Sequence, residues 1–346
     1  MKVSKWLAVM SAVVLISACG GDDSGDADGD DADVTTETDG DDGGQDGEGG
    51  AAVPDPLTLG LVPSQEVDQL VEDADVLGEL IGAELGVTVE THVATDYAAL
   101  VVAMGTGQAD VGMFGPIALV QAVDQSGAEI ILQSVRFGTP TYHTQWFTNN
   151  PDRFCTTDVV TVEDDEGNPY SYCNGTDAAE TGPVGEDALN ELESGEQILF
   201  VDASSASGYY YPATQIQTVT GMDPLVDIDP IFAGGHPNAV LGVQSGEAEV
   251  GVSFDDARTN VVEEEPSIGE DVVVFAWSEE IPNDGVAVSG ELSDEAQQEI
   301  ADAFMAVIET EEGAVAFDDV YSIEGLVPAD LEALEAARQV AANFGG

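Results

Sequence analysis

The sequence has 346 residues, and its 69 aspartates and glutamates outnumber 6 lysines and arginines, which gives a formal net charge of −63 at pH 7. This charge excludes nucleic acid as a partner, because the phosphates of a nucleic acid would be repelled. In dilute buffer the chain would also repel itself, whereas about 1 M salt shortens the screening length to about 3 Å. The composition therefore predicts a protein of a salt-loving organism.

The N-terminus has the pattern of an exported lipoprotein. Two lysines precede an apolar run at residues 7–16, which is too short to span a bilayer as a stable helix. Two small residues and Cys19 follow, as they do at the cleavage site of a bacterial lipoprotein signal. We therefore expect residues 1–18 to be removed and Cys19 to carry acyl chains that anchor the protein to the cell membrane. The alternative is an ordinary cleaved signal in which Cys19 is incidental.

An acidic segment separates this anchor from the rest of the chain. Residues 20–52 consist mainly of Asp, Gly, Glu and Thr and cannot bury a core. We expect residues 19–53 to be a disordered tether that lets the folded part reach away from the membrane. No later stretch is long and apolar enough to cross a membrane, so we expect the folded part to be soluble.

From residue 54 onward, short apolar segments alternate with segments whose apolar residues have helical spacing. The first set contains strands at 57–62, 87–93 and 111–114 and helices at 65–85 and after Asp96, which stands at an N-cap position. The second set contains strands at 198–201, 249–253 and 272–275 and helices at 207–219 and 238–244. A strand at 285–289 and helices at 294–309 and 329–344 complete the chain. This alternation predicts an α/β protein with mainly parallel sheets.

Two such sets in one chain predict two lobes of roughly 100 to 150 residues each. We assign residues 54–140 and 284–346 to the first lobe and residues 141–283 to the second. Two similar segments, 106–113 and 245–252, each have the pattern of a helix end, a glycine turn and a strand. We expect the loop after each of these strands to face a central cleft.

A polar, glycine-rich insertion at residues 152–196 contains Cys155 and Cys173. In an oxidising compartment this pair predicts a disulfide, whose closed loop would contribute about 3 kcal/mol. A metal site is the alternative, but it needs further cysteine or histidine ligands nearby, and the sequence provides none. We therefore expect neither a metal nor a cofactor.

The segment 202–212 follows a predicted strand and opens a predicted helix. The free N–H groups and the positive dipole end of such a helix start favour an anion. Ser205 and Ser207 add hydroxyl donors, although serines at this place also serve as plain helix caps. His236 lies between two glycines and the next helix start, and we interpret it as a ligand-binding residue. These features predict an anion site built from helix starts and hydroxyls, and not from the scarce arginines.

A series of motifs resembles the phosphate-, phosphite- and phosphonate-binding proteins of ABC importers. The motifs are LVPS at 61–64, DYAA at 96–99, GP at 115–116, YHT at 142–144, SASGYYYP at 205–212, GGH at 234–236, DD at 255–256, IPND at 281–284 and YSIEGL at 321–326. The resemblance runs from about residue 57 to residue 344 and implies a two-lobed α/β fold of the type II periplasmic-binding-protein kind, with a hinge and a central ligand cleft. It also implies delivery of a phosphorus oxyanion to an ABC permease, and we expect a monomer.

The resemblance implies a role for each matching position. The expected ligand-binding residues are Tyr97, Tyr142, Ser205, Ala206, Ser207, His236, Asp256 and Asp284. In the family, the serine hydroxyls and local backbone N–H groups hold the phosphorus-bound oxygens, and the tyrosines and the histidine add further contacts to the oxyanion. The two aspartates match acidic positions that receive the ammonium group in aminoethylphosphonate binders.

Two positions depart from the family pattern and leave the identity of the ligand open. Ala206 stands where the family usually has threonine, so one hydroxyl donor is lost. Asp256 matches a position that can be glutamate, so its carboxylate is one methylene shorter. Acidic residues are also so frequent in this chain that Asp256 and Asp284 need not have a ligand role.

Three other functions stay open on the sequence alone. The first is a binding protein for another anion, such as sulfate or a carboxylate, and the second is a surface anion sensor that does not take part in transport. The third is an enzyme that uses Ser205 as nucleophile and His236 as base. The chain has no Gly-x-Ser-x-Gly nucleophile motif and no metal cluster in its sequence, so we expect no catalytic activity.

Overall fold

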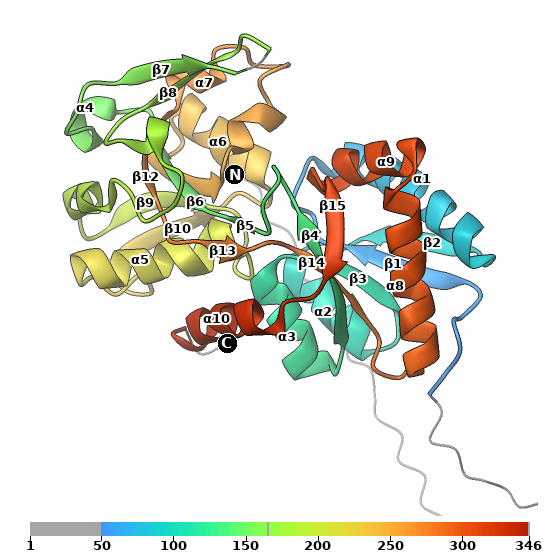
Figure 1. The fold of residues 1–346 in the computed structure, drawn as a ribbon. Coiled ribbons are helices and arrows are strands. Elements are labelled where there is room, and N and C mark those ends of the chain that lie inside the picture. Colours follow the sequence, from blue (N-terminus) through green and yellow to red (C-terminus); the bar gives the residue numbers. More distant parts are fainter. Residues whose placement is uncertain (1–49, 165, 345–346) are drawn as a thin grey trace, which may run out of the picture. The chain divides into compact units, whose positions relative to one another are not determined.

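The computed structural model describes residues 50–164 and 166–344 (Figure 1). The predicted signal peptide at 1–18, the predicted lipidation site Cys19 and nearly all of the predicted tether lie outside the described residues. In the described ranges, no helix combines the length and the apolar composition that a membrane crossing requires.

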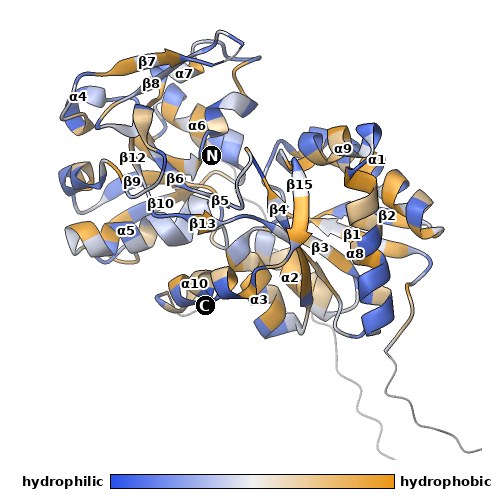
Figure 2. Cartoon of the chain, in the orientation of Figure 1, coloured by the Kyte–Doolittle hydropathy of each residue, from blue (hydrophilic) through white to orange (hydrophobic). Residues whose placement is uncertain are grey.

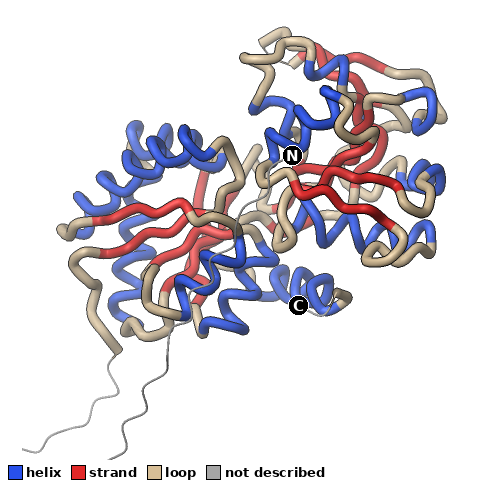
Figure 3. The backbone as a smooth tube through the Cα atoms, turned by 180° about the vertical axis from the view of Figure 1, so that it is seen from behind, coloured by secondary structure: helices blue, strands red, loops and turns tan. Residues whose placement is uncertain are grey.

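The first lobe is built around a six-stranded sheet with the strand order β15-β4-β14-β3-β1-β2. Its strands are β1 (Leu57–Leu61), β2 (Val89–Val93), β3 (Val111–Phe114), β4 (Glu129–Val135), β14 (Gly285–Val288) and β15 (Gly325–Pro328). On one face of the sheet, helices pack against one another; they are α1 (Val67–Leu85), α8 (Asp294–Ile308) and α9 (Glu311–Tyr321). On the other face lie α2 (Tyr97–Gly105) and α3 (Pro116–Ser126), and the view from behind shows both layers (Figure 3).

The second lobe has a seven-stranded sheet with the order β10-β9-β11-β6-β12-β8-β7. Its strands are β6 (Thr144–Thr148), β7 (Val160–Glu163), β8 (Pro169–Tyr172), β9 (Glu196–Phe200), β10 (Ile228–Phe232), β11 (Val250–Phe254) and β12 (Val273–Trp277). Its main helices are α5 (Tyr211–Thr220) and α6 (His236–Ser245), and its short helical segments are α4 (Pro151–Phe154), α7 (Ile268–Asp271), η1 (Thr176–Ala178), η2 (Glu186–Glu191), η3 (Ala206–Tyr210) and η4 (Ala257–Asn260).

Each sheet has its own hydrophobic core. The central strands β3, β11 and β14 are buried along their whole length, which explains their nearly continuous apolar sequences. Figure 2 shows hydrophobic colour along the strands, whereas the outer face of α8 is hydrophilic. Each large apolar side chain that is fully buried contributes about 1.5–3 kcal/mol, so these two cores offset the self-repulsion of the acidic surface.

Both sheets are mixed, and the prediction of mainly parallel sheets is therefore wrong. In the first sheet, β1 is parallel to β2 and β3, but β14 is antiparallel to β3 and β4. In the second sheet, β6 is antiparallel to β11 and β12. The reason is that β6 and β14 are the strands by which the chain enters each lobe from the other. Each of them starts where the neighbouring parallel strands end, and a short apolar run does not encode that direction.

The chain crosses between the lobes through a small antiparallel pair of strands. β5 (Thr141–Tyr142) and β13 (Ile281–Pro282) pair with each other and with neither large sheet. The C-terminal helix α10 (Leu331–Ala342) contacts both lobes, because Leu334 belongs to the first core and Ala337 and Ala341 belong to the second. The segment that we assigned to the first lobe therefore also packs against the second.

The insertion at 152–196 is part of the second sheet and does not stand apart from it. Cys155 and Cys173 form a disulfide, which confirms the predicted pairing. Strand β8 lies parallel to β12, and Tyr170 and Cys173 are buried in the core of the second lobe.

Helix α9 (Glu311–Tyr321) is absent from the predicted elements, whereas one recurring turn is present as predicted. The sequence pattern predicts a single helix at 294–309, but α9 begins immediately afterwards, where Oγ1 of Thr310 accepts a hydrogen bond from the backbone N–H of Gly313 at 2.9 Å. The two similar segments do adopt similar turns, because Gly107 and Gly246 both have a left-handed backbone, with φ of 67° and 81°. Each of these turns leads into a strand, β3 or β11, that ends at the cleft.

Candidate ligand-binding site

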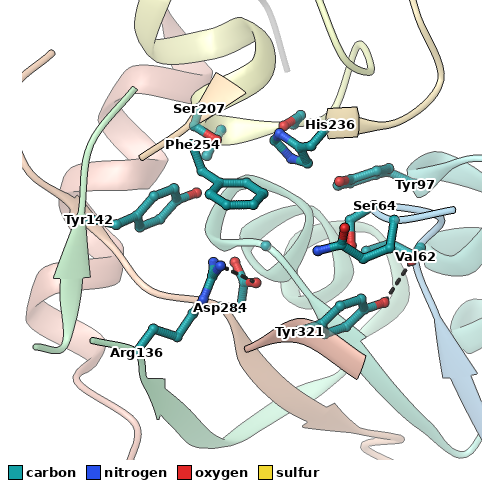
Figure 4. A pocket seen from close by; sticks show the side chains of 14 residues that line it. Val62, Ser64, Tyr97, Arg136, Tyr142, Ser207, His236, Phe254, Asp284 and Tyr321 are labelled. Atoms are coloured by element: carbon teal, nitrogen blue, oxygen red, sulfur yellow. Dashed lines mark hydrogen bonds and ion pairs between the residues drawn. The ribbon is translucent and has the colours of Figure 1, made fainter. Parts of the chain in front are cut away.

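A small cavity lies between the two lobes, where the strands of both sheets end (Figure 4). Its lining consists of Val62, Ser64, Gln65, Tyr97, Gly115, Arg136, Tyr142, Ser205, Ala206, Ser207, His236, Phe254, Asp284 and Tyr321. The volume open to the centre of a water molecule is about 20 Å³. This volume admits little more than one ordered water, so only a compact ligand in direct contact with the walls fits.

A helix start from the second lobe forms one wall of the cavity. η3 continues into α5 without a break, and Ser205 is the N-cap, because its Oγ accepts a hydrogen bond from the backbone N–H of Gly208 at 3.1 Å. The hydroxyl proton of Ser205 is not used in this contact. Ala206 and Ser207 are the first two residues of the helix, and N–H groups at such positions have no acceptor within the helix. The helix start thus presents two hydroxyls and two N–H groups to one small space.

The glycine of this motif allows the helix start to lie close to the preceding strand. The backbone N–H of Val201 donates to the carbonyl oxygen of Gly208 at 3.0 Å. A Cβ atom at position 208 would lie 2.4 Å from Cβ of Val201, which no real side chain tolerates. The close approach of the helix to β9 therefore requires glycine, and it sets the orientation of Ser205 and Ser207.

His236 is the first residue of α6 and forms a second wall from the same lobe. Burial and then the charge of Arg136 lower the pKa of His236 to about 3, so its imidazole is neutral at neutral pH. Nδ1 lies 2.6 Å from Oγ of Ser253. When Ser253 donates its proton to Nδ1, the Nε2–H of the neutral ring is the group that can donate to an anion.

Three tyrosines line the cavity, and two of them, Tyr97 and Tyr142, were predicted as ligand-binding residues. Tyr97 opens α2, where the carboxylate of Asp96 accepts a hydrogen bond from the backbone N–H of Ala99 at 2.7 Å, as the predicted N-cap requires. Tyr142 lies in β5, in the crossing between the lobes. Burial raises the pKa of both phenols well above the usual value, so both hydroxyls stay protonated and can donate hydrogen bonds.

A charged pair completes the lining from the first lobe. Nη1 of Arg136 lies 4.0 Å from Oδ2 of Asp284, and their side chains are 6% and 21% exposed. Burial raises the pKa of Asp284, and the charge of Arg136 opposes this rise. A Cβ atom at Gly115 would lie 3.5 Å from Oδ1 of Asp284, which places the carboxylate beside the start of α3. Asp284 therefore lies within the cavity, as the resemblance implied.

Asp256 does not line the cavity, and its predicted contact with a ligand ammonium is corrected here. Its carboxylate accepts hydrogen bonds from Nε of Arg258 at 2.9 Å and from the hydroxyl of Tyr172 at 3.1 Å. These partners lower the pKa of Asp256 against the opposing effect of burial, which is the larger single cause. The carboxylate is thus already paired with a buried guanidinium two residues along the chain, and it lies outside the lining of the cavity.

Contacts between the lobes hold the walls of the cavity together. The backbone N–H of His236 donates to the carbonyl oxygen of Ser64 at 3.0 Å, and Nδ2 of Asn260 donates to Oε1 of Gln65 at 2.7 Å. Nε2 of Gln121 donates to the hydroxyl of Tyr210 at 3.3 Å. Each of these bonds joins the first lobe to the second, so the described conformation has the two lobes in direct contact around the cavity.

The sequence analysis missed several residues of the lining. The missed residues are Val62, Gln65, Arg136, Phe254 and Tyr321. The expectation that the site contains no arginine is wrong, because Arg136 is buried in the wall of the cavity. One signal for it was available, since Arg136 is one of only four arginines in the sequence. Val62 and Tyr321 lie in two of the motifs that carry the resemblance, LVPS at 61–64 and YSIEGL at 321–326, whereas nothing in the sequence distinguishes Gln65 and Phe254.

Comparisons with known proteins agree with this architecture. Residues 59–334 match the family model described as ABC transporter, phosphonate, periplasmic substrate-binding protein. The phosphate-import protein PhnD of Mycolicibacterium smegmatis is 28% identical over 210 residues, which make up 58% of this chain and 56% of that protein. The chain thus spans a little more than half the length of this curated relative.

Solved structures with a similar fold include two binding proteins from bacteria. PhnD1 from Prochlorococcus marinus, solved in complex with methylphosphonate, has a TM-score of 0.67 at 16% identity, over 84% of this chain and 98% of that one. A binding protein component of an ABC phosphonate transporter from Pseudomonas aeruginosa has a TM-score of 0.66 at 19% identity, over 83% of this chain and 86% of that one. At these identities the likeness establishes the fold, and it confirms the predicted two-lobed α/β class.

Proposed function

Because this chain belongs to the family of periplasmic substrate-binding proteins of phosphonate ABC transporters, we propose that it captures a small phosphorus oxyanion in the cavity and presents it to an ABC permease. The ligand is phosphate, phosphite or a short phosphonate. The family consists of transport proteins and is not an enzyme class, and the proposal includes no catalytic step.

One observation carries the proposal: hydrogen-bond donors of several kinds converge on a cavity that is too small for a large ligand. The second lobe contributes Ser205, Ser207 and the neutral imidazole of His236, while the first contributes Tyr97 and Arg136. Donors from both lobes match the oxygens that a tetrahedral oxyanion presents in different directions. Charge-assisted hydrogen bonds in such a water-poor site are stronger than neutral ones.

The arrangement of donors supports capture by closure of the two lobes. An oxyanion held at the helix start of η3 and α5 meets Tyr97 and Arg136 only when the first lobe approaches. The bonds from His236 to Ser64 and from Asn260 to Gln65 then form across the cleft. Rotation about the paired crossings β5 and β13 is a hinge motion of the kind that periplasmic binding proteins use.

The location follows from the family and from the N-terminal pattern. A periplasmic substrate-binding family operates outside the cytoplasm. We further propose that Cys19 carries a lipid anchor and that residues 19–53 act as the tether between the membrane and the binding unit. The acidic surface opposes the approach of an anion over long distances, so capture works best in salt that screens this field.

Isothermal titration calorimetry in salt of about 1 M or more tests the ligand class. Phosphate, phosphite, methylphosphonate and sulfate are titrated separately into the same protein preparation. We expect saturable binding of at least one phosphorus oxyanion. Binding of sulfate alone would instead favour a binding protein for another anion, and would overturn the proposal.

A double substitution tests the donors at the helix start. Ser205→Ala with Ser207→Ala removes two hydroxyls, and we expect an affinity loss of about tenfold or more for the best ligand, because hydrogen bonds to a charged oxyanion are lost. Ser245→Ala, at the opposite end of α6, is the matched control, since its hydroxyl bonds only the carbonyl oxygen of Gly242 at 3.1 Å. Unchanged affinity in a correctly folded double variant contradicts the proposed site.

A further inference from the structure

The guanidinium of Arg136 is buried in the cavity wall, and none of the described residues makes a hydrogen bond to its Nε. Its side chain is 6% exposed. Nη1 of Arg136 lies 4.0 Å from Oδ2 of Asp284, which is beyond hydrogen-bonding distance. A buried guanidinium normally uses most of its five N–H donors in hydrogen bonds. The N–H donors of Arg136 therefore need acceptor oxygens, and a ligand in the adjacent cavity could supply them.

The side chain of Arg136 is nevertheless held firmly in place. The backbone N–H of Arg136 donates to the carbonyl oxygen of Thr139 at 3.1 Å, and the backbone N–H of Thr139 donates to the carbonyl oxygen of Arg136 at 3.0 Å. The guanidinium carbon lies 4.8 Å from the ring centre of Phe254 in the second lobe and 6.0 Å from that of Tyr142 (Figure 4). Aromatic faces stabilise a cation at these distances, so these two rings hold the guanidinium in position.

We infer that Arg136 is a ligand-binding residue that selects by charge, holding an oxygen of the oxyanion and excluding phosphonates that carry an ammonium group. This inference rests on the proposed function and narrows its ligand class. It replaces the role that the resemblance implied for Asp284, because the counter-charge of this carboxylate is Arg136 and not a ligand ammonium.

The geometry of the pair explains the selection. An ammonium group placed to contact Asp284 would have to share the carboxylate with a guanidinium whose nearest nitrogen lies only 4.0 Å from it. Two cations at such separations repel each other strongly when water is excluded. Phosphate, phosphite and methylphosphonate bring no cation, and their oxygens supply the acceptors that Arg136 lacks.

The test is a comparison of two ligands that differ in an amino group. Calorimetry at high salt gives the affinities of methylphosphonate and 2-aminoethylphosphonate for the unmodified protein and for Arg136→Gln. We expect the unmodified protein to prefer methylphosphonate by about tenfold or more, because of the like-charge contact. In Arg136→Gln we expect methylphosphonate to bind about tenfold or more weakly and the preference to shrink or reverse.

Two further variants separate charge from position. Arg338→Gln removes a positive charge from the solvent-facing side of α10, where Arg338 pairs with Asp124 and Glu335, and we expect both affinities to be unchanged. Arg136→Lys keeps the charge but not the forked donors, so we expect weaker binding with the preference retained. An equal loss for both ligands in Arg136→Gln, or a preference of the unmodified protein for aminoethylphosphonate, overturns the inference. Failure of the unmodified protein to bind either ligand or phosphate contradicts the proposed function itself.

Discussion

Two arginine–aspartate pairs with a buried guanidinium, found among residues 50–164 and 166–344, differ in how their charges are satisfied. In the second lobe, Nε of Arg258 donates to Asp256 at 2.9 Å, and its Nη1 donates to three backbone carbonyl oxygens between 2.7 and 3.2 Å away. In the cavity wall, Nη1 of Arg136 lies 4.0 Å from Oδ2 of Asp284, and Nε of Arg136 has no hydrogen-bond partner in the part of the chain that the structure describes. The Arg258 pair is thus satisfied by contacts within the protein, whereas the Arg136 pair keeps N–H donors that a ligand could use.

The difference shows how a structural charge can be told from a functional one. Burying an ion costs several kcal/mol, and the structure recovers this cost only through good geometry and additional hydrogen bonds. The Arg258 pair has both, and its carbonyl partners, which include Ser171 and Val272, link the insertion to the rest of the second lobe. The Arg136 pair has neither, so an anionic ligand is the partner that would compensate it.

The largest expected effect is loss of stability when the satisfied pair is broken. Arg258→Gln leaves Asp256 as a buried charge without its counter-ion, and we expect the free energy of unfolding to fall by about 3–5 kcal/mol. Chemical denaturation at high salt measures this change. Arg338→Gln, which removes an arginine from an exposed pair, should cost less than about 1 kcal/mol. If both variants lose the same small amount, the Arg258 pair does not have the structural role that its hydrogen bonds indicate.

A smaller effect is expected from the histidine beside the unsatisfied pair. The pKa of His236 is about 3 in the folded protein, against an ordinary value of 6.5, so the unfolded chain takes up a proton that the folded one does not. Stability must therefore fall as the pH falls below 6.5, by about 2 kcal/mol between pH 7 and pH 5 from this group alone. Denaturation at a series of pH values measures this slope.

The variant His236→Asn isolates this contribution. It lacks the group that titrates, so we expect its stability to depend less steeply on pH over the same interval. His92→Asn is the matched control, because His92 lies exposed in β2, and the slope of the unmodified protein should persist. Identical slopes for His236→Asn and the unmodified protein would show that the imidazole is not buried as a neutral group.

Features that depend on a few neighbouring residues, or on a small number of cysteines, made part of the fold and of the site predictable from the sequence. The N-cap at Asp96, the helix start at Ser205 and the disulfide between Cys155 and Cys173 each depend on neighbouring residues or on a small set of cysteines. Helix starts are determined within a few residues, so their capacity to bind anions can be inferred before the fold is known. The placement of His236 at such a start followed from the same reasoning.

The rest depended on contacts between distant segments. Arg136 reaches the cavity because the end of β4 meets Phe254, which ends β11 in the other lobe, and no local pattern encodes that meeting. The exclusion of Asp256 likewise required the position of Tyr172, which lies in the insertion and donates its hydroxyl to this carboxylate at 3.1 Å. The directions of β6 and β14 were missed for a related reason, since they depend on which lobe the chain has just left.

The smallest effect tests whether Arg136 and His236 act on the same space. The charge of Arg136 is the second cause, after burial, of the low pKa of His236, so Arg136→Gln should raise that pKa. The rise should be smaller than the lowering due to burial, and NMR titration of the imidazole resonances measures it.

Arg338→Gln should leave the pKa of His236 unchanged, because Arg338 lies in an exposed pair on α10. A bound oxyanion should act in the same direction as Arg136→Gln, since a negative charge beside the ring favours its protonated form. If neither Arg136→Gln nor saturating phosphate moves the pKa of His236, the guanidinium and the imidazole do not share one cavity. The proposal that Arg136 binds the ligand would then lose its support.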